Sequence, residues 1–300
     1  MSRKKRIRRT IKTIDSILST AFLAVLLLLL LFAVYIELDA YHIVTGASSS
    51  QYQAYKPSAD DTVSFDELVA LNPDVIGWLT IDGTNIDYPL VQGASNNTYI
   101  NRDVFKEFSL TGSIFLDSRN APDFSDTLSI VYGHNMAGEA MFGGIDRYED
   151  PAYFNEHLAG TLFYGGAYYR LRIFAYFTAN GYDAKVYNVG LSEEQYAGWV
   201  EQIVSLAVNR TAEIPENGPI LLMSTCASGE TNGRTLLAAS IEPGGTPPEV
   251  QGTASLPAAV LSRVTTPGQE RLLWPYLLAA FILLLLLTAV YEHRKQRKGR

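Results

Sequence analysis

Two long apolar stretches dominate the hydropathy pattern of this chain. Residues 17–36 and residues 272–291 contain no charged side chain. Twenty residues of α-helix, at 1.5 Å per residue, span about 30 Å, the thickness of the hydrocarbon core of a bilayer. A cleaved signal peptide is the alternative for the first stretch, but its apolar run is long for that role and no small-x-small cleavage site follows closely. The pattern therefore predicts two membrane-spanning helices.

Between these stretches, short runs rich in β-branched and aromatic residues are separated by turn residues, which is typical of strands. Strands are expected at 75–81, 86–91, 113–116, 128–132, 161–164, 168–177, 220–225 and 234–241. Capping boxes of the form Ser-x-x-Glu and Ser-x-x-Gln predict helices over residues 64–71 and 192–208. Because strands and helices do not alternate regularly, the pattern predicts a mostly-β barrel with a few helices, flanked by the N- and C-terminal membrane helices.

These elements divide the chain into seven segments. The central one is long enough to form one domain with its own core. The predicted segments are a basic cytoplasmic segment (1–16), a membrane helix (17–36), a linker (37–62), the globular domain (63–242), a Pro/Gly/Thr-rich linker (243–271), a second membrane helix (272–291) and a basic cytoplasmic tail (292–300).

The distribution of charge predicts how the chain is oriented. Residues 1–16 carry seven Lys or Arg against one acid, and residues 292–300 carry five against one. Because Lys and Arg concentrate on the cytoplasmic side, we expect a two-pass protein of the cell membrane with both termini in the cytoplasm and the globular domain outside. Residues 37–271 hold 12 basic and 29 acidic side chains. Such an acidic domain would repel the phosphates of nucleic acid, so no nucleic-acid partner is expected.

Cys226 is the single cysteine of the chain and directly follows the apolar run 220–225. Without a second cysteine it cannot form an internal disulfide. Free cysteine is among the most buried residue types, so a structural thiol in the core is one interpretation. A lone thiol outside the cell is at risk of oxidation, which favours the other interpretation, a catalytic nucleophile.

A nucleophilic cysteine needs a histidine or arginine nearby to stabilise its thiolate. Two of the four histidines, His42 and His293, lie beside the predicted membrane spans. His157 is expected on a solvated helix, whereas His134 follows an apolar strand, where positioned catalytic groups are common. His134 is the better candidate, with a turn histidine satisfied by backbone as the alternative. Arg234 begins the strand after the cysteine, where it could stabilise an oxyanion or form a surface salt bridge.

These residues lie in segments that resemble a known family, the sortases, and within it class B. Their joint occurrence is specific, and the resemblance covers residues 65–242. The segments that carry it are Tyr-Gly-His-Asn-Met at 132–136 with Met-Phe-Gly at 141–143, Ser-Thr-Cys at 224–226 with Arg234, Asn-Pro-Asp-Val-Ile-Gly-Trp at 72–78 with Asn-Ile-Asp-Tyr-Pro-Leu-Val-Gln at 85–92, and Gly-Ser-Ile-Phe-Leu-Asp at 112–117.

The resemblance implies a sortase β-barrel and a cysteine transpeptidase without a cofactor. Carried over by position, Cys226 would be the nucleophile, His134 the general acid and base, and Arg234 the stabiliser of oxyanion and substrate. The implied substrate-binding positions are Thr225, Ser224, Asn135 and Leu116.

The implied partners are surface proteins or pilins that bear a C-terminal sorting signal. The cysteine would cleave that signal and hold the protein as a thioester, and an amine of the peptidoglycan cross-bridge or of a pilin lysine would resolve it. The second membrane span departs from class B, whose members usually have one N-terminal anchor, and is familiar from pilin-polymerising class C enzymes. Cell-wall anchoring and pilus polymerisation therefore both stay open.

Three other functions compete with this interpretation. A cysteine hydrolase would release its product to water, although in papain-like enzymes the cysteine precedes the histidine, the reverse of the order here. A non-catalytic membrane-tethered scaffold would not need the thiol. A Ca²⁺ site at Asp117, Asp123 and Asp126 lacks the EF-hand register, and Asp residues in a Pro-containing loop are more often turn formers. We expect no metal.

Overall fold

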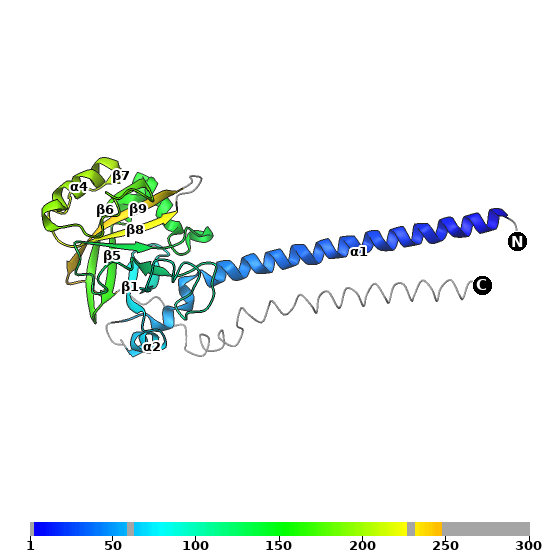
Figure 1. Ribbon diagram of the computed structural model, residues 1–300, viewed down its shortest axis with the longest axis horizontal. Helices are drawn as coiled ribbons and strands as arrows, with labels where there is room; N and C mark the ends of the chain where they lie inside the picture. The colour runs from blue at the N-terminus through cyan, green and yellow to red at the C-terminus, as the bar shows by residue number, and fades with distance from the viewer. Residues whose placement is uncertain (1–2, 59–62, 227–231, 248–300) are drawn as a thin grey trace. The chain divides into compact units, whose positions relative to one another are not determined.

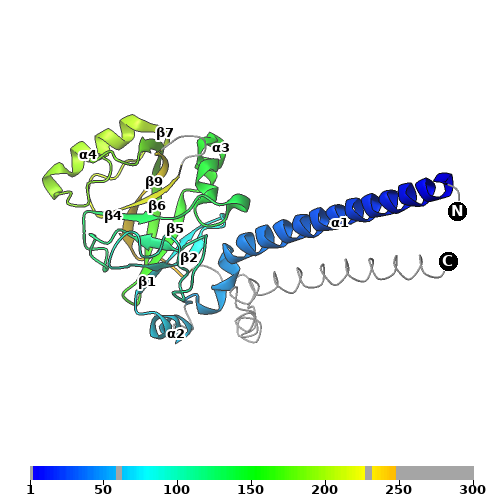
Figure 2. The same cartoon turned by 45° about the vertical axis from the view of Figure 1, so that its right-hand side comes forward.

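The structure is a computed structural model that describes residues 3–58, 63–226 and 232–247 (Figures 1 and 2). The chain divides into two compact units, residues 1–42 with 257–300 and residues 43–256, each of which is described by itself. The predicted second membrane helix at 272–291 and the tail at 292–300 lie outside the described residues, as does the predicted linker beyond residue 247.

Helix α1 (Arg3–Gly46) contains the first apolar stretch. Its segment Arg6–Leu38 contains an 18-residue window with a mean hydropathy of 2.9 and is long and apolar enough to cross a membrane, and no other helix in the described ranges meets the same test. The helix is longer than the predicted span of 17–36 at both ends, because no Gly or Pro interrupts the chain between residues 3 and 45.

The second unit is built on a β-barrel whose strands pair in both antiparallel and parallel directions. Strands follow the order β5-β1-β2-β3-β4-β8-β9-β6, and pairing of β6 with β5 closes the ring, while β7 adds to the outer edge of β6. This confirms the predicted mostly-β barrel. The strands are β1 (Val75–Ile81), β2 (Asp87–Val91), β3 (Ile114–Leu116), β4 (Leu128–Tyr132), β5 (Ala159–Tyr164), β6 (Ala167–Asn180), β7 (Ala207–Arg210), β8 (Ile220–Cys226) and β9 (Gly233–Pro243).

Helices and 3-10 turns connect and cover the strands. Helix α4 (Glu193–Leu206) lies over the side of the barrel formed by β6 and β9 (Figures 1 and 2). The remaining elements are η1 (Ser49–Gln51), η2 (Gln53–Tyr55), α2 (Val63–Leu71), η3 (Ala137–Glu139), η4 (Gly143–Glu149) and α3 (Pro151–Glu156).

Strand β8 shows why this sequence forms a barrel with two hydrophobic layers. Leu221 and Met223 join the larger core cluster, whereas Ile220 and Leu222 join a second cluster beneath α4. Successive side chains of a strand point to opposite faces, so a strand covered on both faces reads as an unbroken apolar run. All four residues are fully buried, which accounts for the continuous run seen in the sequence.

One of the two predicted capping boxes is confirmed and the other is wrong. The capping box of Ser192 and Gln195 is present at the start of α4. Helix α2 begins at Val63, so Ser64 lies inside the helix and its predicted capping box is wrong. Helix α4 stops at Leu206 rather than near residue 208, because the chain turns there into β7, a four-residue strand with only partly buried residues that hydropathy did not reveal.

Part of the predicted linker 37–62 packs on the barrel instead of standing free. Tyr52 and Tyr55 are 3% and 8% exposed, and both rings contact Phe105. Tyr88 donates a hydrogen bond from its hydroxyl to the carbonyl of Ala47 at 2.8 Å. The linker prediction rested on polar composition and overlooked these aromatic anchors, each of which buries a large apolar area.

Candidate active site

Three neighbouring strands bring the predicted catalytic residues to one edge of the barrel. Cys226 ends β8, and its Cα partner in the antiparallel ladder is Arg234 at the start of β9. Strand β4 runs parallel to β8 on the other side, with Tyr132 paired to Ser224. Tyr132 and Ser224 are the last pair of this ladder, and His134 and Cys226 each follow that pair by two residues.

The three strands that carry these residues share one packed face of the sheet. Ile130, Leu222 and Leu236, one on each strand, all pack into the second hydrophobic cluster beneath α4, called the outer cluster below. Arg234 lies two residues from Leu236 on β9, and side chains two apart point to the same side of a strand. The Arg234 side chain therefore belongs to the same face as the outer cluster.

His134 is half-buried and anchored by a backbone carbonyl. Its Nε2 lies 2.9 Å from the carbonyl oxygen of Ile100, in the long connection between β2 and β3. Because a carbonyl oxygen can only accept a hydrogen bond, Nε2 carries the proton and donates it. No sequence pattern points to this partner, because every residue has a backbone carbonyl.

Arg234 is partly buried, and its side chain packs against Gly181, the residue that directly follows β6. A Cβ placed on Gly181 would lie 3.0 Å from Nε of Arg234. The absence of a side chain at Gly181 therefore leaves room for the arginine to lie along the end of β6. A guanidinium held in this way presents oriented donors to an anionic group.

The other predicted residues occupy different environments. Ser224 is 1% exposed, with its hydroxyl 2.9 Å from the hydroxyl of Tyr187, and Thr225 is 2% exposed with no hydrogen-bond partner for Oγ1 among the described residues. Asn135 is half-buried and donates from Nδ2 to Asp146 at 2.8 Å. Leu116 on β3 is fully buried in the larger core cluster.

His157, the rejected histidine, has a structural environment. It caps the C-terminal end of α3 and stacks on Tyr153 with ring centroids 3.9 Å apart. Its Nδ1 lies 2.7 Å from the carbonyl oxygen of Tyr153, so it donates back to its own helix. His157 precedes β5, which pairs with β1 and β6 and not with β8.

A buried carboxylate beside β4 was missed as part of the site. Asp117, which directly follows β3, is fully buried and accepts two hydrogen bonds from the Arg119 side chain, one from Asn96 and one from the Tyr132 hydroxyl at 2.9 Å. Burial alone raises the pKa of Asp117, but these donors, Arg119 first among them, outweigh it and lower the pKa to about 2. Asp117 stays ionised and ties down the strand that precedes His134.

Tyr132 extends this network toward β8. Its ring is stacked on Tyr187, with centroids 6.3 Å apart and planes at 16°. Tyr187 in turn bonds to Ser224, two residues before Cys226. Burial, followed by the charge of Asp117, raises the pKa of Tyr132 above its usual value, so its hydroxyl remains a donor. The spacing Asp-x-Arg after a strand was the one sequence signal that could have revealed this cluster.

The aspartates near this network hydrogen-bond to their own loop. Asp126 accepts hydrogen bonds from Asn120 and from the backbone of Ala121, and Asp123 accepts one from the backbone of Ser125. Within the part of the chain that the structure describes, no three His, Cys, Asp or Glu residues gather as metal ligands. These aspartates shape the loop between β3 and β4.

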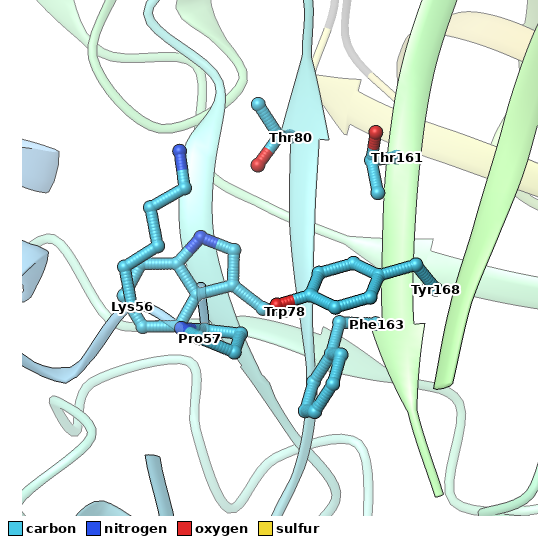
Figure 3. Close-up of a pocket in the computed structure, with 7 residues that line it drawn as sticks. All are labelled: Lys56, Pro57, Trp78, Thr80, Thr161, Phe163 and Tyr168. Atoms are coloured by element: carbon cyan, nitrogen blue, oxygen red, sulfur yellow. The ribbon is translucent and has the colours of Figure 1, made fainter. Parts of the chain in front are cut away.

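A second polar cluster lies where the N-terminal segment meets β1 and β5, away from the three catalytic candidates. Figure 3 shows Lys56 and Pro57 beside the indole of Trp78, with Tyr168 alongside. The Lys56 ammonium lies 2.8 Å from Asp87 on β2. The aromatic side chains fill the space between the segment and the strands, so this pocket is a packing contact of the N-terminal segment.

Comparison with known proteins identifies this architecture. No protein-family model matches the chain. The chain is 27% identical over 180 residues to sortase B of Staphylococcus aureus, covering 59% of this chain and 74% of that protein. Sortase B of Clostridium perfringens superposes with a TM-score of 0.56 at 31% identity, covering 59% of this chain and 98% of the other. A class B sortase of Streptococcus pyogenes involved in pilus biogenesis gives 0.55 at 36% identity, covering 60% and 98%.

The barrel and these similarities together define the class. The chain belongs to the class B sortases. It is accordingly a cysteine transpeptidase of the sortase type.

Proposed function

We propose that Cys226, His134 and Arg234 carry out the transpeptidation. The proposal rests above all on one observation, the register that brings the ends of β4, β8 and the start of β9 to the same edge. Each residue also supplies the chemistry that its role requires: a single thiol, an imidazole with one nitrogen anchored, and a guanidinium packed on Gly181. The outer cluster beneath α4 packs side chains from all three strands, among them Ile130, Leu222 and Leu236.

The first half of the reaction forms an acyl-enzyme. The Cys226 thiolate attacks the carbonyl carbon of a peptide bond in the sorting signal, and the electron pair moves to the carbonyl oxygen. The Arg234 guanidinium stabilises this oxyanion. The tetrahedral intermediate collapses, the C–N bond breaks, and the His134 imidazolium gives its proton to the departing amine. A thioester on Cys226 remains.

The second half transfers the acyl group to an amine. The incoming amine attacks the thioester, neutral His134 takes its proton, and the thiolate of Cys226 leaves. We propose that the acylated protein is a surface protein or pilin and that the amine comes from the peptidoglycan cross-bridge or a pilin lysine. The pilus role of the Streptococcus pyogenes relative supports the pilin as one such substrate.

The four remaining predicted residues contribute unequally to this proposal. Asn135 directly follows His134 and is half-exposed, so it is placed to contact a bound peptide. Ser224, Thr225 and Leu116 are buried, and we propose that they act through the backbone of their strands rather than by side-chain contact.

We further propose that the enzyme works at the outer face of the membrane. Helix α1 supplies one apolar segment of sufficient length, and basic residues precede it. A second span at 272–291 would return the basic tail to the cytoplasm. Protease protection in spheroplasts tests this topology: both tails should resist an external protease while the domain is accessible, and a cleavable C-terminal tail would contradict the second span.

The proposed function is tested by the fate of the acyl group. Full-length protein in detergent is incubated with a panel of sorting-signal peptides, with and without a glycine-based amine, and followed by intact-protein mass spectrometry. A transpeptidase forms an acyl mass that the amine discharges faster than water does, with a ligated peptide as product. Discharge at an equal rate without amine would instead make the enzyme a hydrolase.

A further inference from the structure

The hydrogen bond between His134 and Ile100 has a further consequence for the proton transfer. Nε2 of His134 donates to the Ile100 carbonyl at 2.9 Å. A neutral imidazole carries one proton, on one nitrogen only. If that proton is committed to the Ile100 carbonyl, the other nitrogen, Nδ1, is the one with a free lone pair.

The Ile100 carbonyl is held by bonds on both sides. Ser113 donates from its backbone to the carbonyl of Tyr99 at 3.1 Å, and Ser109 donates from its backbone to the carbonyl of Asn101 at 3.1 Å. The peptide bonds that precede and follow the one carrying the Ile100 carbonyl are therefore hydrogen-bonded to residues 109–113 of the same loop. Such a carbonyl has little freedom to turn away from its partner.

The side chain of the preceding residue anchors this loop in the core. Tyr99 is 1% exposed, and its hydroxyl donates to Asp74 at 2.7 Å and accepts from Asn72 at 2.9 Å. Asn72 is itself fully buried. The loop that presents the carbonyl is thus hydrogen-bonded to the turn that leads into β1.

Gly112 fits against this carbonyl as only glycine can. Its φ is +59°, and a Cβ added there would lie 2.4 Å from the Ile100 carbonyl oxygen and 2.7 Å from that of Tyr99. A side chain would have to push the backbone oxygen away. The glycine that opens the segment Gly-Ser-Ile-Phe-Leu-Asp at 112–117 therefore has a physical reason to be there.

We propose that the Ile100 carbonyl is the positioning group of His134, fixing the Nε2–H tautomer so that Nδ1 exchanges the proton during catalysis. This rests on the proposed role of His134 as general acid and base. In acyl-enzyme formation the proton on Nδ1 of the imidazolium passes to the leaving amine as the C–N bond breaks, and Nε2–H stays on the carbonyl. In the second half Nδ1 takes a proton from the incoming amine as the thioester C–S bond breaks.

The tautomer can be read directly by NMR. Full-length protein with ¹⁵N-labelled histidine is prepared as the Cys226→Ala variant, so that no thiolate draws a second proton onto the ring. A matched sample that also carries His134→Gln identifies the His134 signals. We expect protonated Nε2 and unprotonated Nδ1 in the neutral ring. The opposite tautomer, with the proton on Nδ1, would overturn the proposal.

Two glycine variants test the consequence for catalysis. Gly112→Ala displaces the Ile100 carbonyl, whereas Gly165→Ala in the β5–β6 hairpin imposes a similar backbone strain, with φ +58°, in open space. We expect kcat/KM of Gly112→Ala to fall by about ten-fold to a hundred-fold, chiefly in kcat, because misplacing a catalytic group by about 1 Å costs on that order. Gly165→Ala should stay within about two-fold of the unmodified enzyme. Equal effects of the two substitutions would overturn the positioning role.

A subtler variant removes dependence on the folding of Gly112→Ala. Replacing the peptide bond between Ile100 and Asn101 by an ester, with an α-hydroxy acid at position 101, weakens the carbonyl as an acceptor and changes no side chain. We expect kcat to fall with KM within about two-fold, and unchanged kcat would overturn the proposal. An unmodified chain that forms no acyl-enzyme would contradict the proposed function, whereas an active chain with the Nδ1–H tautomer would contradict only the positioning role.

Discussion

Two carboxylates of the barrel, Asp87 and Asp117, are stabilised in the same way but hold different parts of the molecule in place. Each gathers side-chain donors that compensate for its removal from water. The donors to Asp87 are Gln53, Lys56, Trp78 and Thr80. The donors to Asp117 are Arg119, Asn96 and Tyr132.

The difference lies in what each carboxylate holds. Asp87 binds the segment that enters the barrel, through Gln53 and Lys56, to strands β1 and β2. Asp117 binds Tyr132, the residue that ends β4 two positions before His134. One cluster fastens a connection and the other fixes the edge where the chemistry is proposed to occur. Disturbing the first should change stability alone, and disturbing the second should change stability and rate.

The largest expected effect comes from the histidine on the Asp117 side. His134→Ala should lower kcat/KM by about 10³-fold, since general acid and base catalysis supplies on the order of 10²–10⁴. His157→Ala is the matched control, because the His157 ring packs on Tyr153 and Tyr148 and bonds to its own helix. Steady-state kinetics of peptide ligation measure both. An inactive His157→Ala alongside an active His134→Ala would reverse the assignment.

A smaller loss is expected from Arg234→Lys. Lysine keeps the charge but loses the planar set of donors, so kcat/KM should fall by about 10²-fold, within the range for loss of one oxyanion donor. Arg172→Lys on the exposed part of β6, where Arg172 pairs with Glu213 at 2.7 Å, should remain within about two-fold. Full activity of Arg234→Lys would show that an oriented guanidinium is not required.

The expected difference between the Asp87 and Asp117 clusters is tested by removing one hydroxyl donor from each carboxylate. Tyr132→Phe removes a donor from Asp117 and Thr80→Val removes one from Asp87, with little change of shape. Each should lower the free energy of unfolding by about 1 kcal/mol. Only Tyr132→Phe should also lower kcat/KM, by about ten-fold, because the strand end before His134 loses an anchor. Parallel denaturant titrations and kinetics measure both quantities.

Either of two results would break that comparison. A rate loss in Thr80→Val equal to that in Tyr132→Phe would make the effect one of general stability. A full rate in Tyr132→Phe, with the expected loss of stability, would show that Asp117 has no more influence on the site than Asp87 has.

The last prediction concerns stability in acid and involves no loss of rate at neutral pH. The pKa of Asp117 is about 2 in the folded protein, below its ordinary value of 3.8, so the unfolded chain takes up the proton first. Its contribution to stability, about 2 kcal/mol, is therefore complete above about pH 4 and is lost as the pH falls toward about 2. Unfolding titrations at the two pH values should show a loss in the unmodified protein that Asp117→Asn lacks. An equal loss in both would contradict the assignment.

The fold could be predicted from sequence to the extent that alternation and turns are local. Strands 75–81 and 128–132 were predicted to the residue, because each is an apolar run bounded by turn residues. Strand β7 was missed because its four residues are only partly buried, and the packing of Tyr52 was missed because its partners lie far along the chain. Hydropathy carries no information about such long-range contacts.

The candidate site, too, could be predicted from the sequence only in part. Cys226 and His134 could be nominated because few thiols and imidazoles were available, and chemistry narrowed the choice. The Ile100 carbonyl could not be nominated, since every residue offers the same backbone group. The link from Asp117 to Tyr132 depends on the antiparallel pairing of β3 with β4, which no local pattern specifies.

The most direct test of the account is to locate the acyl group. Full-length enzyme is mixed with a sorting-signal peptide in the absence of amine, quenched in acid and analysed by intact-protein mass spectrometry before and after hydroxylamine, which cleaves thioesters. Because Cys226 is the single thiol of the chain, we expect one hydroxylamine-labile acyl mass per chain that is absent from Cys226→Ala. Ligation by Cys226→Ala at the unmodified rate would contradict it.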